Sequence, residues 1–353
     1  MATAFCAILS RFSRAPRNPS YQVSEFDFHL SDLNATAVIV QVGIDSPVRD
    51  VATRLGVFVL ELHSDSSCSG LFSLSHEDET LEKHDPPEFT GRLDEALVLH
   101  TSGTTSRPKM VPLSHENLVV SAVNISESLA LSDRDVCMNV MPLFHIHGLM
   151  ASVLASFQAG AGVVCTPGFS ARSFLEQLSI TGATWYSAVP TMHQAIVGRA
   201  QANPSSTHKI NLRFIRSSSA SLAPSVMHDL EDVFGVPVIE SYGMTEASHQ
   251  MTSNPLPPLE RKPGSVGLAA GPDVSIMIDG GVVVGPNQVG EIVIRGKNVT
   301  AGYSKNPEAN ALAFTNGWFH TGDQGYLDND GYLKITGRLK EIINRGGEKI
   351  SPR

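Results

Sequence analysis

A cluster of hydroxyl side chains around a glycine occupies residues 101–109, which read Thr-Ser-Gly-Thr-Thr-Ser-Arg-Pro-Lys. The residues that can carry chemistry there are Thr101, Ser102, Gly103, Thr104, Thr105 and Lys109. Hydroxyls and free backbone N–H groups donate to phosphate oxygens, glycine lets the backbone come close, and lysine adds positive charge. Because the Gly-Lys-Ser/Thr of a Walker A loop is absent, the stretch predicts a phosphate-binding loop of another kind. An ordinary surface loop is the alternative.

A carboxylate beside a threonine follows an apolar stretch in Ser241-Tyr-Gly-Met-Thr-Glu246. At the end of a strand, Glu246 can hold a hard cation such as Mg²⁺ while Thr245 contacts a phosphate. The alternative for this stretch alone is a solvated turn. The stretch therefore indicates a second place where phosphate and metal chemistry can occur.

Other metal-ligating residue types are scattered. His145 and His147 form an HxH pair, but no third ligand is evident, so the pair does not predict a zinc site. The four cysteines, Cys6, Cys68, Cys137 and Cys165, show no CxxC spacing. They predict neither a disulfide framework nor a zinc site, and they favour a reducing compartment.

Strand and helix signals alternate through the first two-thirds of the chain, which predicts a parallel sheet covered by helices on both faces. The predicted strands are 35–42, 57–62, 96–100, 136–141, 162–165, 183–188, 212–217 and 236–242. The predicted helices are 47–55, 149–159, 170–180, 190–202, 223–234 and one that Ser114 caps and that runs to Leu129. Residues 63–92 are polar and contain Pro86-Pro87, so they are predicted to be a surface loop.

The pattern changes after residue 263. Short strands are predicted over 274–278, 282–284, 290–295 and 332–336, separated by Gly, Pro, Asn and Asp. This style predicts a small antiparallel barrel or sheet appended to the α/β part.

Composition narrows the class of protein. The 353 residues are 42% hydrophobic and 17% charged, which suits a globular protein with one or two large cores. A net charge of -9 argues against a nucleic-acid partner, because phosphate backbones attract excess Lys and Arg. No apolar run reaches the about 18 residues that a membrane span needs.

The two ends of the chain bear on location. Arg11, Arg14 and Arg17 without an acid are compatible with a mitochondrial transit peptide, but the residues that follow already read as folded domain. The final Ser-Pro-Arg is not the Ser-Lys-Leu peroxisomal address. A cytoplasmic location is therefore expected.

Five motifs, in one order, resemble those of the adenylate-forming superfamily, which includes acyl-CoA synthetases and peptide-synthetase adenylation domains. Residues 101–109 resemble its TSGTTGxPKG loop, with Ser106 and Met110 in place of two glycines. The other motifs are Tyr242–Glu246 (YGxTE), 290–296 with Gly302-Tyr303, Gly317–Asp323 (WxxTGD) and the hinge motif Gly337–Glu341. The resemblance implies the family's α/β large-domain fold: parallel sheets covered by helices, plus a small antiparallel β-barrel.

The resemblance also implies roles for individual residues. ATP, Mg²⁺ and coenzyme A are the implied co-substrates. The nucleotide would contact Thr101 to Thr105, Ser219 and Ala220, with Tyr242 stacked on adenine and Asp323 and Arg338 at the ribose. The catalytic group would be Lys109, Thr245 at the α-phosphate, and Glu246, which would hold Mg²⁺. The acid's carboxylate would attack the α-phosphorus of ATP, and CoA thiolate would then release AMP.

The acid-pocket stretches, 142–149, 216–224 and 246–255, resemble the oxalate-using branch of the 4-coumarate-ligase-like enzymes. A hydroxycinnamate or fatty-acid pocket needs apolar walls. Here His145 or His147, Ser219 and His249 are expected to converge instead, because a buried second carboxylate needs donors around it. Oxalate is the favoured acid, and core or surface histidines are the alternative.

Members of the superfamily continue past the GGEKISP stretch into a mobile domain of about 100 residues. The resemblance therefore implies that residues 1–337 are the AMP-binding large domain, incomplete at its N-terminus, and that 338–353 are the hinge and the start of an absent C-terminal domain. For this chain alone we expect slow adenylate formation and little thioester synthesis. A catalytically inactive nucleotide-binding product, and a same-family ligase for a hydroxycinnamate or fatty acid, are the alternatives.

Overall fold

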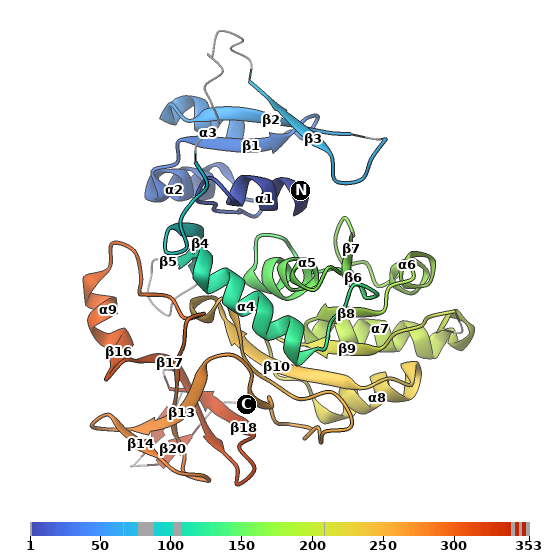
Figure 1. Cartoon of the computed structure of the whole chain (residues 1–353), viewed down its shortest axis with the longest axis vertical. Coiled ribbons are helices and arrows are strands. Elements are labelled where there is room, and N and C mark those ends of the chain that lie inside the picture. The colour runs from blue at the N-terminus through green and yellow to red at the C-terminus, as the bar shows by residue number, and fades with distance from the viewer. Residues whose placement is uncertain are drawn as a thin grey trace. The chain divides into compact units, whose positions relative to one another are not determined.

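The computed structural model describes residues 2–65, 67–76, 88–101, 108–207, 209–339, 343–345 and 348–350. The chain forms two compact units, Met1–Thr90 and Gly91–Arg353, each with its own hydrophobic core (Figure 1).

The first unit packs helices against a three-stranded sheet of order β1-β2-β3. Its elements are α1 (Ala2–Leu9), α2 (Val23–Leu33), β1 (Ala37–Gln41), α3 (Val48–Leu55), β2 (Phe58–Ser64) and β3 (Phe72–Ser75). Phe26 and Leu30 of α2 meet Val51 and Ala52 of α3 in its core. β1 runs parallel to β2, as expected when a helix connects two strands of one sheet.

The predicted loop over residues 63–92 is wrong where β3 forms. Phe72–Ser75 pairs antiparallel with β2, Ser75 opposite Glu61 and Phe72 opposite Ser64. The Phe-Ser-Leu-Ser alternation is a strand pattern, but it is short and lies in a polar stretch, so only its pairing partner reveals it.

The second unit begins with a hairpin and a long helix: β4 (Glu95–Thr101), β5 (Lys109–Ser114) and α4 (His115–Ser128). Ser114 caps α4 as predicted. Its hydroxyl accepts from the Asn117 backbone N–H at 3.2 Å, and the Asn117 side chain accepts in return from the Ser114 N–H at 2.8 Å. The strand β5 was not predicted.

A seven-stranded sheet of order β12-β11-β10-β9-β8-β6-β7 forms the centre of the second unit (Figure 1). Its strands are β6 (Val136–Asn139), β7 (Gly162–Cys165), β8 (Trp185–Ala188), β9 (Phe214–Ser217), β10 (Val238–Met244), β11 (His249–Ser253) and β12 (Leu268–Ala269). The strands β6 to β10 are parallel, whereas β11 and β12 add antiparallel at one edge. The predicted parallel sheet is confirmed for β6 to β10, whereas the predicted strands 35–42 and 57–62 belong to the sheet of the first unit and 96–100 pairs antiparallel with β5.

Helices cover both faces of this sheet. On one face lie α6 (Phe174–Thr181), α7 (Pro190–Ala202) and α8 (Pro224–Phe234), which share a core with β6, β8 and β9. On the other face lie α4, a π-helix (His147–Leu154) and α5 (Ala155–Gln158). A short 3₁₀ helix spans Pro204–Thr207. The predicted helix over 149–159 is thus two pieces, the first of them π-helical.

A six-stranded antiparallel sheet follows, of order β14-β13-β15-β17-β16 with β18 paired to β17. Its elements are β13 (Asp273–Ile278), β14 (Val282–Val284), β15 (Gly290–Arg295), α9 (Pro307–Ala313), β16 (Phe314–Thr315), β17 (Trp318–Leu327) and β18 (Leu333–Arg338). Two further strands, β19 (Ile343–Arg345) and β20 (Glu348–Ile350), pair with each other. The change of style predicted after residue 263 is confirmed.

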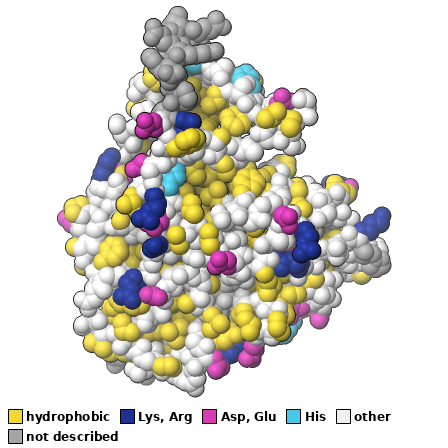
Figure 2. Space-filling model, viewed as in Figure 1, with side chains coloured by type: hydrophobic (Ala, Val, Ile, Leu, Met, Phe, Trp, Pro, Cys, Tyr) yellow, Lys and Arg dark blue, Asp and Glu magenta, His cyan; other side chains and the backbone are white. Residues whose placement is uncertain are grey.

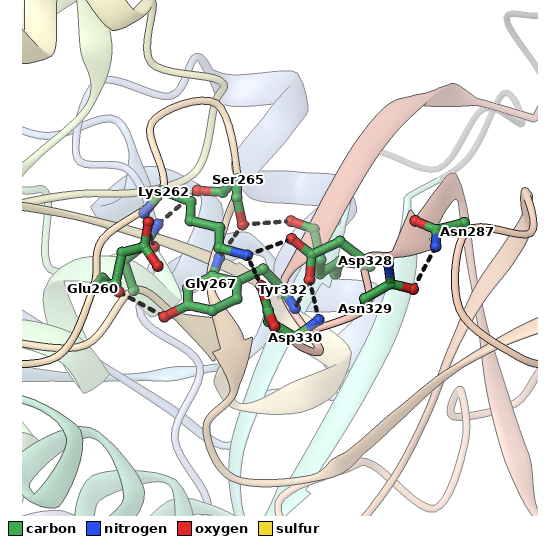
Figure 3. A network of polar contacts seen from close by, with 11 residues as sticks. Glu260, Lys262, Ser265, Gly267, Asn287, Asp328, Asn329, Asp330 and Tyr332 are labelled. Atoms are coloured by element: carbon green, nitrogen blue, oxygen red, sulfur yellow. Dashed lines mark hydrogen bonds and ion pairs between the residues drawn. The ribbon is translucent and has the colours of Figure 1, made fainter.

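A polar network fastens this antiparallel sheet to the segment that precedes β12 (Figure 3). The Lys262 Nζ lies 2.8 Å from an Asp328 carboxylate oxygen and 2.6 Å from one of Asp330, and over the ring of Tyr332. The Tyr332 hydroxyl donates to the Glu260 carbonyl at 2.6 Å. The β17–β18 turn is thereby tied to residues 260–262.

The surface carries both signs of charge. On the face in Figure 2, the basic and acidic side chains of the described residues are interspersed, without a broad basic area. Among the helices that the structure describes, none combines the length and apolar character that a membrane crossing needs.

Candidate active site

The catalytic lysine expected from the sequence lies close to the expected metal ligand. Lys109 opens β5 opposite Thr101 at the end of β4. Its Nζ lies 4.4 Å from the centre of the Tyr303 ring, and the Tyr303 hydroxyl donates to a Glu246 carboxylate oxygen at 2.9 Å. Tyr303 therefore links a cation and a carboxylate that came from motifs more than a hundred residues apart.

Glu246 lies in a 3₁₀ turn, Thr245–Ala247, directly after β10 and is 5% exposed. Burial raises its pKa, and the Tyr303 hydroxyl and the Lys109 charge oppose that shift. In the described part of the chain no three His, Cys, Asp or Glu side chains gather to hold a metal. One carboxylate suits Mg²⁺ that arrives with a triphosphate, since Mg²⁺ takes its remaining ligands from phosphate and water.

A second set of side chains, Tyr242, Asp323 and Arg338, connects β10 to the antiparallel sheet. The Tyr242 hydroxyl donates to Asp323, and the Arg338 Nε donates to the other Asp323 oxygen at 3.0 Å. Asp323 and Arg338 face each other in the β17–β18 pairing. The three residues expected around adenine and ribose are thus brought together, whereas Ser102, Gly103, Thr104 and Thr105 lie outside the described residues.

An arginine is buried at the end of β9. In the β8–β9 pairing, Ser187 lies beside Arg216. Two residues earlier on each strand, and on the same face of the sheet, the rings of Trp185 and Phe214 stack. Arg216 is 0% exposed, and burial lowers the pKa of its guanidinium to about 9. Its Nη2 donates to the Gln250 side-chain oxygen at 3.0 Å, and Gln250 in turn donates to the Ala270 carbonyl at 3.1 Å.

His147 is the first residue of the π-helix and is connected to Arg216 through the Ser187 hydroxyl. A wider turn is common where a functional side chain must be re-aimed. The following residue must be glycine, because a Cβ on Gly148 would lie 2.6 Å from the Pro142 carbonyl oxygen. The His147 Nε2 lies 2.6 Å from the Ser187 hydroxyl, and its Nδ1 lies 3.0 Å from the Ser219 hydroxyl.

His249 reaches the same place from the first residue of β11. The β10–β11 pairing shifts register between Tyr242 and Gly243, and a Cβ on Gly243 would lie 2.0 Å from the His249 carbonyl oxygen. The backbone is also unusual, with φ of 94° at His249 and 71° at Ser219. Positive φ at non-glycine residues is costly and tends to occur at functional sites.

The two imidazoles, Arg216 and Ser187 form one buried cluster, and the exposed Ser219 lies at its edge. The ring centres of His147 and His249 are 4.9 Å apart, and Arg216 Nη1 lies 3.2 Å from His249 Nε2 and 3.2 Å from the Ser187 hydroxyl. Burial first, and then the Arg216 charge, keep the pKa of both histidines well below the usual range. Arg216 therefore supplies the charge of the cluster.

His147, Ser219 and His249 are brought together, but His145 is exposed beside Phe144 and is not part of the cluster. Ala220 follows Ser219 at an exposed position. Sequence reasoning assigned no role to Arg216, Ser187 or Tyr303. For Arg216 a signal existed, since an arginine interrupts a strand whose other members are apolar or small.

By its fold, the chain is an α/β protein of the adenylate-forming kind. It superposes on ATP-bound MatB from Rhodopseudomonas palustris with a TM-score of 0.83 at 28% identity, over 96% of this chain and 66% of that one. It superposes on o-succinylbenzoate–CoA synthetase (MenE) from Bacillus subtilis, in complex with ATP and magnesium, with a TM-score of 0.77 at 28% identity, over 94% and 65%.

The sequence comparison agrees. The chain belongs to the AMP-binding enzyme family, whose model matches residues 1–304. It is 47% identical to the oxalate–CoA ligase of Arabidopsis thaliana over 99% of this chain and 68% of the relative. The chain thus spans about two thirds of the length of these proteins.

Proposed function

We propose that this chain is the nucleotide- and acid-binding part of an ATP-dependent acid–CoA ligase that activates a small dicarboxylic acid, with oxalate favoured. The observation that carries the proposal is the convergence of His147, Ser219 and His249 above the buried Arg216. The similarity to an oxalate–CoA ligase supports the same substrate.

The chemistry of the cluster explains the choice of acid. A distal carboxylate that enters a buried site keeps its charge only where donors and positive charge replace its water. A hydroxycinnamate ring or an alkyl chain gains nothing from such groups and leaves them unpaired, which is costly. Polar side chains next to a buried arginine therefore favour a short acid with a second anionic end.

The first half-reaction needs charge neutralisation more than covalent help from the protein. The acid's carboxylate attacks the α-phosphorus in line, the bond to the bridging oxygen breaks, and pyrophosphate leaves. Lys109 and Thr245 would counter the repulsion between carboxylate and phosphates, and Glu246 would hold Mg²⁺, which supplies Lewis-acid charge neutralisation when bound.

The second set of side chains would hold the rest of the nucleotide. Asp323 and Arg338 would contact the ribose, and Tyr242 would supply the aromatic face for adenine; the hydrogen bonds that join these three side chains support this assignment. The sulfur of CoA would then attack the acyl carbon, and AMP would leave. This second half-reaction is proposed from family membership alone.

Acid-dependent ATP–pyrophosphate exchange tests the proposal. Oxalate, malonate, 4-coumarate and octanoate are compared, with Ser219→Ala and His249→Ala as variants. Each removes a hydrogen bond to a charged group, so each is expected to reduce kcat/KM for oxalate by roughly 10- to 100-fold. Lys109→Ala is expected to abolish exchange with every acid.

Matched controls lie on α8, where Ser225 and His228 are exposed. Ser225→Ala and His228→Ala are expected to leave exchange unchanged. Exchange with 4-coumarate or octanoate but not oxalate would contradict the acid assignment. ATP binding by calorimetry without exchange on any acid would favour a nucleotide-binding protein without catalysis.

A further inference from the structure

Arg216 has no carboxylate partner within the described part of the chain, although it is 0% exposed. A buried cation that lacks an anion is costly, and such a group is retained mainly where function needs it. Arg216 contacts Ser187 and His249 directly, and Ser187 connects it to His147. The contacts of Arg216 therefore determine what those residues present to a ligand.

We propose that Arg216 is a positioning residue that fixes the hydrogen positions of both buried histidines, so that the acid pocket presents donors and selects the dianionic form of a small dicarboxylic acid. This inference rests on the proposed function for its substrate, but its first step is a property of the folded chain alone.

The Arg216 guanidinium only donates hydrogen bonds. Its Nη1 lies 3.2 Å from the Ser187 hydroxyl oxygen and 3.2 Å from His249 Nε2, and it carries one hydrogen for each. Both atoms must therefore accept. A neutral imidazole accepts at one nitrogen and donates at the other.

The first chain of hydrogen bonds passes through His147. The Ser187 oxygen accepts from Arg216, and within the described part of the chain its own hydrogen has no acceptor other than His147 Nε2, at 2.6 Å. His147 then carries its hydrogen on Nδ1 and donates to the Ser219 oxygen at 3.0 Å. The Ser219 hydroxyl, on an exposed residue, is left to donate outward.

The second chain ends at His249. Its Nε2 accepts from Arg216, so its hydrogen is on Nδ1. That nitrogen lies 2.7 Å from the position of a Cβ on Gly243, and the glycine leaves it without a side chain against it. Both series of hydrogen bonds thus start at the Arg216 guanidinium. One ends in the Ser219 O–H and the other in the His249 Nδ1–H, and both of these groups are donors.

Without Arg216, nothing fixes which atom donates and which accepts in these hydrogen bonds. The Ser187 hydroxyl would be free to accept from His147 Nε2, which would make His147 Nδ1 an acceptor. A carboxylate would then face a lone pair, and the compensating positive charge would also be gone. Selection for a second carboxylate should weaken, while nucleotide binding at Lys109 and Tyr242 should not.

Histidine tautomers can be measured directly by long-range ¹H–¹⁵N NMR on the whole chain with ¹⁵N-labelled imidazoles. Signals are assigned by their loss in His147→Gln and His249→Gln. Wild-type protein is expected to show both rings neutral with hydrogen on Nδ1. Hydrogen on Nε2 of either ring overturns the proposal, and this measurement needs no variant at Arg216.

Oxalate and oxamate form a matched pair of acids, because oxamate replaces the distal carboxylate with a neutral amide of similar size. In pyrophosphate exchange, Arg216→Met is expected to lower the ratio of kcat/KM for oxalate over oxamate by about tenfold or more, through KM for oxalate. Arg216→Lys keeps the charge and should restore most of the ratio. KM for ATP should stay unchanged.

The outcomes separate the two proposals. If wild-type protein uses neither oxalate nor another dicarboxylic acid, the proposed function fails, whatever the tautomers are. If wild-type protein uses oxalate but Arg216→Met slows all acids equally with the ratio preserved, Arg216 is a structural residue and the inference alone fails.

Discussion

Among single residues, Glu240 is a buried carboxyl group on β10, the strand that also carries Tyr242. It is 4% exposed, and one of its carboxylate oxygens has no partner among the described residues. Burial raises its pKa to about 7, although the backbone N–H groups of Gly264 and Leu222 oppose the shift. The folded state therefore binds a proton that the unfolded chain releases at a lower pH.

This sets the sign of a pH dependence. A raised pKa contributes stability that is fully present below the unfolded value and is lost as pH rises through about 7. The side chain in Glu240→Gln cannot ionise. Between acidic and alkaline pH, the free energy of unfolding of the wild type should therefore fall by on the order of 2 kcal/mol more than that of this variant. Urea unfolding at pH 5 and pH 8 measures this. Glu260→Gln, at an exposed position, is the control, and parallel behaviour of wild type and Glu240→Gln would contradict the expectation.

Several residues of the candidate site were named from the sequence because their types and order match family motifs. Lys109, Glu246, Tyr242 and Asp323 are of this kind. Arg216 was not given a role, because an arginine in a strand normally points to solvent. Only the π-helix and α4 over that face of the sheet show that it is buried, and no local pattern predicts that cover.

At the scale of elements, local pattern sufficed where a strand or helix is long and regular. The predicted bounds of α7 (Pro190–Ala202) and β15 (Gly290–Arg295) match the structure. The strands β12, β16 and β17 were missed, and so were β3, β5 and β11. The last three share a feature. Each is antiparallel to a neighbour that is close in sequence, and each is stabilised by pairing with that neighbour more than by its own composition.

The β10–β11 hairpin yields an element-scale prediction. A Cβ on Gly243 would lie 2.0 Å from the His249 carbonyl oxygen, which is backbone and cannot yield easily. Gly243→Ala should therefore destabilise the second unit by about 1–3 kcal/mol or more and displace His249. A comparison variant is Gly198→Ala in α7, where nothing lies within 4 Å. That change should stabilise by about 0.5–1 kcal/mol. Thermal unfolding compares the two, and equal effects would contradict the steric argument.

At the scale of the whole molecule, the succession of a parallel α/β sheet and an antiparallel sheet could be predicted, because the spacing of apolar residues and of Gly and Pro changes after residue 263. The contacts that hold the antiparallel sheet against residues 260–262 could not be predicted. Lys262 lies 66 residues before Asp328 and 68 before Asp330, and no helix or strand period connects them.

The Lys262 network in Figure 3 predicts a contribution to thermal stability that depends on salt and pH. Lys262 lowers the pKa of Asp328, so this pair contributes stability above the usual carboxyl pKa and loses it as pH falls. Lys262→Met keeps the stem that lies over Tyr332 but removes the charge shared by two carboxylates. The variant should unfold at a lower temperature than wild type, and the gap should narrow at high salt and at low pH.

Calorimetry at low and high ionic strength, and at neutral and acidic pH, measures that gap, and Lys209→Met at an exposed position is the control for losing one positive charge. The charge of Lys262 would matter little if the gap were the same under all these conditions, because only packing is insensitive to both salt and protonation. A gap that closes on acidification without closing in salt would mean that the contact of Lys262 with its two carboxylates is screened little, because the Asp328 hydrogen bonds with the Asp330 and Tyr332 N–H groups are present in both proteins and cancel in the gap.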